Sequence, residues 1–136
     1  MPKPENLEGG TVQERLEGIL REVRNISPGI IGSSVISIEG FTLASLIPAG
    51  EFDEGLLAAR ATAFLTTGEQ IAQDLLNETP EQAIVRTEDK YIIFNAITST
   101  AVLVVLADET AAKWGMVIYW LKERILPKLK PIMAKK

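Results

Sequence analysis

The feature that most constrains this chain is a long predicted helix over residues 52–77, with Asp53 as its N-cap and Asn77 near its end. One side has the apolar spacing of a core-facing helix, and it contains Leu57, Ala61, Phe64, Leu65, Gly68, Ile71, Ala72 and Leu75. The opposite side would normally be charged. Instead it carries small or uncharged residues, with Glu69 at its edge: Ala59, Thr62, Ala63, Thr66, Gln70 and Gln73.

The uncharged side of this helix has two interpretations. Alanine is the best helix former, so the side could be an ordinary exposed surface. Threonine, however, lowers helix propensity, and small side chains let another surface approach closely. The pattern therefore favours a helix that packs on both sides, and association with another surface over catalysis.

A helix and two strands are predicted before this segment. Thr11 and Glu14 match a capping box, so a helix is expected from there to about Asn25. Residues 29–48 have the pattern of two strands joined at Glu39-Gly40, because glycine adopts the positive φ of a tight turn. Three small residues in the first strand indicate close approach by a helix: Gly32, Ser33 and Ser34.

Three further strands are predicted over Gln82–Arg86, Tyr91–Ile97 and Ala101–Ala107. The links between them are too short for a parallel crossover, so the strands should be antiparallel neighbours. The last two are almost continuously apolar, which is typical of strands covered on both faces. Together with a final helix, the order α-β-β-α-β-β-β-α predicts an α+β fold with three layers (α/β/α) and a five-stranded antiparallel sheet.

The final helix should follow residues 108–110. Its expected core stripe is Trp114, Val117, Ile118, Leu121, Ile125 and Leu129. Pro127 should kink or fray its last turn. Three residues lie off the stripe, namely Met116, Tyr119 and Trp120. They form either a contact surface for a partner or packing against the first helix.

Composition removes many kinds of chemistry. The chain has no Cys and no His, which excludes thiolate or imidazole catalysis and metal sites built on either ligand. We expect no enzyme activity, no metal and no cofactor. The net charge of −4 without a basic stripe disfavours nucleic acid, and no apolar run is long enough to insert into a membrane.

The chain is expected to form one domain over residues 11–130. Residues 1–10 should be disordered, and 131–136 should form a basic tail. Residues 1–10 also lack the apolar region of a secretory signal, so a cytoplasmic location is expected.

Several of these segments together resemble the roadblock (dynein light-chain) domain family, which has a profilin-like fold. They are the hairpin VISIEGFTLAS, the helix GLLAARATAFLTTGEQIAQDL, the strand ending in AVLVVLAD, and the Trp114-Gly115 step. The family usually has Asp-Gly where this chain has Glu39-Gly40. The resemblance covers roughly residues 11–126.

The resemblance implies a sheet order of 2-1-5-4-3 and a homodimer in which the long helices pack antiparallel and the third strands pair. The expected interface therefore includes Ala59, Thr62, Ala63, Thr66, Gln70, Gln73, Ala83 and Val85. A self-complementary seam suits a two-fold axis.

The resemblance also implies a regulatory or scaffold role for a small Ras-like GTPase or for a motor or signalling complex. Met116, Tyr119 and Trp120 are the expected partner contacts. A GTPase can be accelerated by an arginine supplied in trans. Arg60 and Arg86 are the candidates, although arginines in such positions more commonly form salt bridges.

Two other classes of protein remain as alternatives. A small-molecule sensor of the PAS or GAF type would need a pocket between sheet and helix, with Ser33, Ser37, Thr42 and Asn95 as its polar groups. A carboxylate enzyme would use the adjacent pair Asp108-Glu109. That pair already has a structural role, since acidic residues offset the dipole at a helix start.

Overall fold

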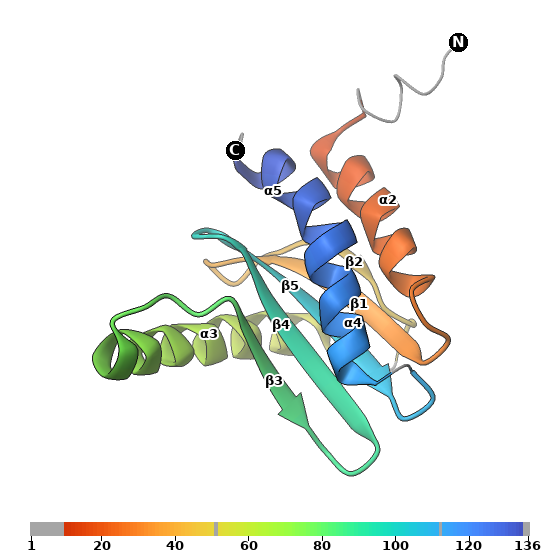
Figure 1. Ribbon diagram of the computed structural model, residues 1–136. Helices are drawn as coiled ribbons and strands as arrows, with labels where there is room; N and C mark the ends of the chain where they lie inside the picture. The colour runs from red at the N-terminus through yellow and green to blue at the C-terminus, as the bar shows by residue number, and fades with distance from the viewer. Residues whose placement is uncertain (1–9, 51, 112, 135–136) are drawn as a thin grey trace.

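Five strands form one antiparallel sheet in the order β2-β1-β5-β4-β3, as the resemblance implied. The computed structural model describes residues 10–50, 52–111 and 113–134. The elements, in chain order, are α2 (Val12–Arg24), β1 (Ile30–Ser37), β2 (Thr42–Leu46), α3 (Glu54–Leu76), β3 (Gln82–Arg86), β4 (Lys90–Thr98), β5 (Ala101–Asp108), α4 (Trp114–Trp120), η1 (Leu121–Ile125) and α5 (Leu126–Ala134). Helix α3 covers one face, and the other helices cover the opposite face (Figure 1). The predicted three-layer α+β class is confirmed.

Local sequence signals explain where these elements begin and end. Thr11 and Glu14 form the expected reciprocal capping box on α2. The Asp53 carboxylate accepts a 3.0 Å hydrogen bond from the backbone N–H of Leu56, which starts α3. Gly40 has φ +94° in the turn between β1 and β2, a conformation that favours glycine. Strand β3 spans the predicted residues, and β4 and β5 extend only one residue beyond the predicted ends.

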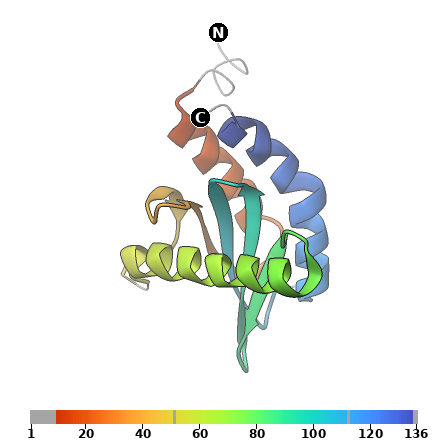
Figure 2. The same ribbon diagram turned by 90° about the vertical axis from the view of Figure 1, so that its left-hand side faces the viewer.

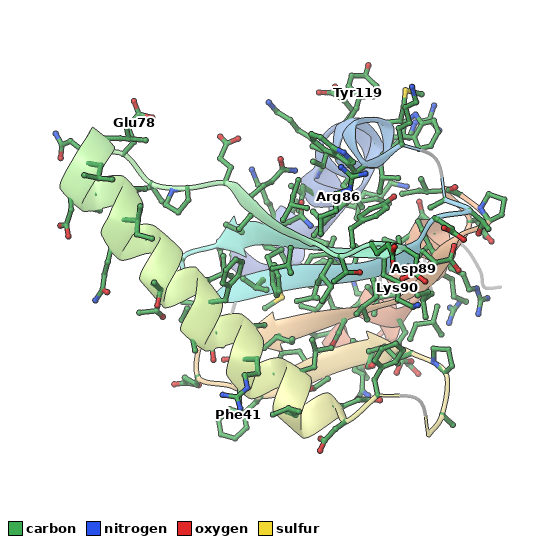
Figure 3. All side chains as sticks on the ribbon, turned by 90° about the horizontal axis from the view of Figure 1, so that it is seen from below. Phe41, Glu78, Arg86, Asp89, Lys90 and Tyr119 are labelled. Carbon is green, nitrogen blue, oxygen red and sulfur yellow. The ribbon has the colours of Figure 1, made fainter. Side chains whose placement is uncertain are left out.

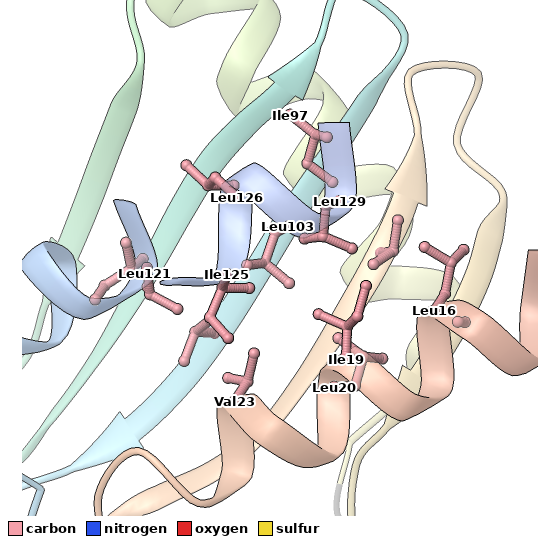
Figure 4. Close-up of a cluster of buried hydrophobic side chains, with 14 of the residues drawn as sticks. Leu16, Ile19, Leu20, Val23, Ile97, Leu103, Leu121, Ile125, Leu126 and Leu129 are labelled. Atoms are coloured by element: carbon pink, nitrogen blue, oxygen red, sulfur yellow. The ribbon is translucent and has the colours of Figure 1, made fainter. Parts of the chain in front are cut away.

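The larger core lies between the sheet and the layer of α2, α4, η1 and α5. Leu16, Leu20 and Val23 of α2 are fully buried there against Leu121 and Leu129 (Figure 4). Leu103 of the central strand β5 lies beneath them. Both faces of β5 are buried, as its continuous apolar run predicted.

The other face carries a smaller core under the first half of α3. Ala58, Ala61 and Leu65 pack on side chains of β1, β4 and β5. Ser34 shares this face of β1 with Ile36 and is 1% exposed, so a small strand residue does lie beneath a helix. Gly32 is different, because an added Cβ would lie 2.9 Å from the carbonyl oxygen of Leu46. Strand β2 and the residue after it, not a helix, approach Gly32 closely.

The final helix continues where the sequence predicted a kink or fraying. The backbone N–H of Leu126 bonds to the carbonyl of Leu121, an i→i+5 bond that closes the π-helical segment η1. Pro127 has no N–H to donate, and it follows this wider turn, so the helix passes through it. Helix α5 also continues over 131–134, part of the expected basic tail, because Ile132 and Met133 are buried.

Trp114 and the two ends of the chain are the remaining points of comparison with the sequence predictions. Trp114 was expected in the core but is 44% exposed, since it is the first residue of α4 and projects beyond the packed part of the helix. Apart from Gly10, the N-terminal segment expected to be disordered lies outside the described residues, as do residues 135 and 136. Within the described chain, no helix has the length and apolarity needed to span a bilayer.

Candidate association surface

The second half of α3 projects beyond the sheet that its first half covers. Figure 2 shows the helix running across the strands. Its 23 residues make a helix roughly 34 Å long, whereas five strands place the outermost strand axes only about 20 Å apart. The apolar stripe therefore continues where the sheet below it has ended.

Two residues predicted to lie in the core are exposed for this reason, since Leu75 is 77% exposed and Ile71 is 55% exposed. Phe64 lies closer to the sheet and is 38% exposed. The ring of Phe64 still contacts Phe94 of β4, with centroids 4.8 Å apart. In the single chain, the predicted core position is correct for Ala61 and Leu65 and wrong for Phe64, Ile71 and Leu75, and Leu57 is half-buried.

Strand β3 forms the edge of the sheet beyond which the second half of α3 projects. Some of its backbone N–H and C=O groups face away from β4. The bonds from Ala96 N–H to Glu81 C=O and from Thr87 N–H to Lys90 C=O establish which residues of β3 bond to β4. Because bonded and non-bonded pairs alternate in an antiparallel ladder, Ala83 and Val85 also bond to β4. The N–H and C=O groups of Gln82, Ile84 and Arg86 then point outward along an open edge.

The side chains of β3 complete a continuous surface with α3. Ala83 and Val85 pair with Phe94 and Ile92, so they lie on the sheet face that α3 covers. Val85 is 37% exposed. We call the combined region the α3–β3 surface, defined by Phe64, Ile71, Leu75, Ala83 and Val85 together with the open edge of Gln82, Ile84 and Arg86.

The residues predicted on the uncharged side of α3 have mixed environments. Ala59, Ala63, Thr66 and Gln70 are exposed. The Thr62 hydroxyl donates to the carbonyls of Ala58 and Ala59 in its own helix, at 3.2 and 3.0 Å. The Gln73 side-chain amide donates to the Glu78 carbonyl at 2.8 Å, so Gln73 has a local role at the end of the helix. The interface assigned to these residues remains a prediction.

The three expected partner contacts on the last helix separate into two groups. Met116 is 50% exposed and Tyr119 is 59% exposed, and Figure 3 shows Tyr119 projecting from the outer side of α4. Trp120 is half-buried and lines a cavity of about 750 Å³ with Asn25 and Ile26 at the end of α2. Trp120 thus shares a cavity with residues that follow the first helix, and its role as a partner contact stays a prediction.

The candidate arginines and polar groups do not form a reaction centre. Arg60 and Arg86 are exposed, and neither forms an ion pair within the described residues. Asn95 is fully buried, accepts a hydrogen bond from Gln82 at 3.0 Å and donates to the Leu103 carbonyl at 3.2 Å. Both the oxygen and the nitrogen of the Asn95 side-chain amide are therefore hydrogen-bonded within the protein. None of the cavities described here is lined by Asn95 together with the serines expected of a sensor pocket.

Asp108 is the last residue of β5, and α4 begins only at Trp114 with no acidic residue in its first turn, so the expected role of Asp108-Glu109 at a helix start is not observed. Asp108 instead stabilises the turn that follows the strand. Its carboxylate accepts hydrogen bonds from the Thr110 hydroxyl and the Thr110 backbone N–H, and these bonds lower the pKa of Asp108. Burial, with a smaller contribution from the Asp108 charge, raises the pKa of the Tyr91 phenol. Over the described residues, no group of three Asp or Glu side chains is arranged to hold a metal ion.

Comparison with known families identifies the domain. The model of the Roadblock/LC7 domain matches residues 17–107, which is more than half of the chain. This chain belongs to the Roadblock/LC7 domain family. The resemblance seen in the hairpin, the long helix and the strand AVLVVLAD is thereby confirmed.

Solved structures share the fold of this Roadblock/LC7 chain. The gliding protein MglB from Thermus thermophilus has a TM-score of 0.81 at 23% identity, covering 93% of this chain and 94% of that one. MglB of Myxococcus xanthus has a TM-score of 0.80 at 15% identity, with 90% and 97% covered. Profilin IB of Acanthamoeba castellanii has a TM-score of 0.60 at 14% identity, with 89% and 98% covered, which confirms the profilin-like fold.

The sequence comparison with curated proteins gave no significant match to this Roadblock/LC7 chain. The fold and the family are thus shown by the domain match and the structural likeness.

Proposed function

We propose that this Roadblock/LC7 chain is a homodimeric regulatory or scaffold module that acts on a small Ras-like GTPase or on a motor or signalling complex. The observation that carries the proposal is the α3–β3 surface, where an apolar helix stripe extends beyond its own sheet next to an open strand edge. The role requires no catalytic residues of its own.

A second copy is the partner that best matches both parts of this surface. If two β3 strands pair antiparallel about a two-fold axis, each sheet continues beneath the projecting half of the other copy's α3. Ile71 and Leu75 then cover apolar side chains such as Val85 of the partner copy. Burying them removes the unfavourable hydration of the stripe.

The same arrangement satisfies the backbone of β3. Unpaired N–H and C=O groups along a strand edge promote uncontrolled association unless they are covered. Pairing of Gln82, Ile84 and Arg86 with their own symmetry copies uses these groups in a closed dimer. The open edge of β3 and the apolar stripe of α3 therefore favour the same arrangement, in which two β3 strands pair about a two-fold axis.

The link to a GTPase rests on the family resemblance. A regulator can act by ordering the switch loops of a GTPase, and such a surface needs no nucleophile. Exposed Met116 and Tyr119 on α4 lie outside the proposed dimer interface and offer an apolar surface for such a partner. The structural neighbour from Thermus thermophilus is named a gliding protein, which supports a role of this kind for the present chain.

The proposal has two parts, the homodimer and the GTPase partner, and each part has its own measurement. Light scattering should give about twice the chain mass of 14.9 kDa at micromolar concentration. Thr66→Arg should reduce the mass towards that of one chain if the uncharged side of α3 also lies in the interface. Thr42→Arg, the same change at an exposed threonine of the opposite edge strand, should leave the dimer intact.

The proposed action on a GTPase is tested with purified Ras-like GTPases from the source organism. GTP hydrolysis is measured with and without this protein, and complex formation is followed by gel filtration. A changed rate or a stable complex with one of them supports GTPase regulation. A dimer that neither binds any of them nor changes hydrolysis contradicts this part of the proposal and leaves the association intact.

A further inference from the structure

A groove lies on the opposite side of the sheet from α3, between the last helix and the segment that leads into β3. Its volume is about 570 Å³. Buried Ile97 and Leu126 provide an apolar floor, and Pro80 and Pro127 form parts of its walls. We call it the α5 groove.

Two lysines lie along the helix side of the groove. Lys122 and Lys130 are exposed, and neither has a carboxylate within ion-pair distance among the residues that the structure describes. Lys128, which faces the other flank of the same helix, is paired with Glu22. Glu81 is the one acidic residue in the groove lining described here. The groove therefore presents unpaired positive charge above an apolar floor.

We propose that the α5 groove binds an acidic peptide segment of a partner protein, with an apolar side chain on Ile97 and Leu126 and carboxylates near Lys122 and Lys130. The two lysines are eight positions apart, so their backbones are separated by about 12 Å along the helix. Two carboxylates about four positions apart in an extended chain span the same distance. The groove thus specifies both the charge and the spacing of the segment.

Several features make the groove suitable for a peptide. Its wall near β3 is held in place, because the Gln82 side chain donates to the buried Asn95 at 3.0 Å. A preformed wall lowers the entropy lost on binding. The floor lies below the rim formed by the lysines and prolines, so a side chain that projects from a peptide can reach it. All lining residues come from one copy, so this inference does not rest on the proposed dimer.

The test uses a short fluorescein-labelled peptide with two glutamates four positions apart and a leucine between them. Fluorescence anisotropy measures its binding to the full chain. The Lys122→Glu and Lys130→Glu double variant should weaken binding more than tenfold. Two matched controls separate site from charge: Lys113→Glu with Lys90→Glu gives the same change in net charge elsewhere, and a second peptide has the same composition with its glutamates adjacent.

The expected result is saturable binding by wild type and by the control variant, with weaker binding of the rearranged peptide. Circular dichroism and light scattering should show that the groove variant keeps its fold and its oligomeric mass. Absence of saturable binding by wild type overturns the proposal, as does equal weakening by both variants. If the groove variant instead loses binding to vesicles containing phosphatidylserine but keeps the peptide, the groove is a membrane contact and the peptide proposal is wrong.

Discussion

The two faces of the sheet differ in how completely the chain covers them. One face is covered by α2, α4, η1 and α5, and its core side chains such as Leu20 and Leu121 have no exposure to solvent. The other face is covered by α3 alone, whose stripe passes from buried Ala61 to Leu75 with 77% exposure. The covered face explains why a single chain folds, and the partly covered face explains why we expect it to associate.

The difference arises from length and direction more than from hydrophobicity. On the covered face, the C-terminal helix packs along the sheet beside α2. On the other face, α3 runs across the strands and is longer than the sheet is wide (Figures 1 and 2). A regular apolar stripe therefore has support under only part of its length.

The largest expected effect comes from the covered face. Leu121→Ala should lower the free energy of unfolding by about 2–5 kcal/mol, because it leaves a cavity in a fully buried site. The loss should be the same at every protein concentration. Ile71→Ala should produce a loss that grows with protein concentration, since this side chain is buried only in the dimer. Denaturant unfolding at several protein concentrations separates the two effects. If the loss of stability depends on protein concentration in the same way for both variants, the proposed difference between the two faces is wrong.

Proline substitutions in β3 distinguish its inner and outer hydrogen bonds. Val85→Pro removes an N–H that bonds to β4 and should cost about 3 kcal/mol or more of fold stability. Arg86→Pro removes an outward N–H, so it should keep the single-chain fold and weaken the dimer. Arg86→Ala controls for loss of the guanidinium. Chemical unfolding and light scattering provide the two readouts, and a dimer that tolerates Arg86→Pro unchanged contradicts pairing through this edge.

A charge at the end of the α3 stripe should act on association alone. Leu75→Glu should weaken the dimer at least tenfold, which corresponds to about 1.4 kcal/mol. Leu75 is largely exposed in the single chain, so the circular dichroism spectrum should not change. Sedimentation at several concentrations measures the dissociation constant. If Leu75→Glu has the same dissociation constant as the wild-type protein, Leu75 remains exposed to solvent in the dimer and is not part of the interface.

The smallest expected effect concerns Asp108, the last residue of β5. Hydrogen bonds from Thr110 lower the pKa of Asp108 in the folded state, so the charged carboxylate stabilises the fold above its unfolded pKa. That contribution is lost as the pH falls through the lower folded value. Asp108→Asn should therefore reduce the urea midpoint slightly at pH 7, and the difference from wild type should shrink below about pH 4. A difference that does not depend on pH would assign the effect to packing.

Local sequence signals predicted individual elements better than their environments. The Thr11 capping box, the Gly40 turn and the bounds of β3 follow from side-chain chemistry close to each position. The sheet order came from the family resemblance, because strand spacing alone does not specify it. Periodicity identified the stripe of α3, but it contains no information on how far the sheet extends beneath Ile71.

Other differences also come from geometry that a helical or strand periodicity does not describe. Trp114 has the correct helical spacing for the core, yet it occupies the first position of α4, where the packed layer has not begun. Pro127 follows a wider turn whose i→i+5 bond does not appear in a 3.6-residue pattern. The α5 groove joins residues from the loop before β3 to residues of the last helix, far apart in the chain. Their proximity depends on the sheet order.

Hydrogen exchange at β3, followed residue by residue with NMR, tests the central claim most directly. If two copies pair through this edge, the outward amides of Gln82, Ile84 and Arg86 should be protected at micromolar concentration to a degree similar to the inward amides of Ala83 and Val85. Leu75→Glu should remove the outward protection alone. Rapid exchange of the three outward amides in the wild-type protein, beside protected inward ones, would contradict the dimer and the function proposed on it.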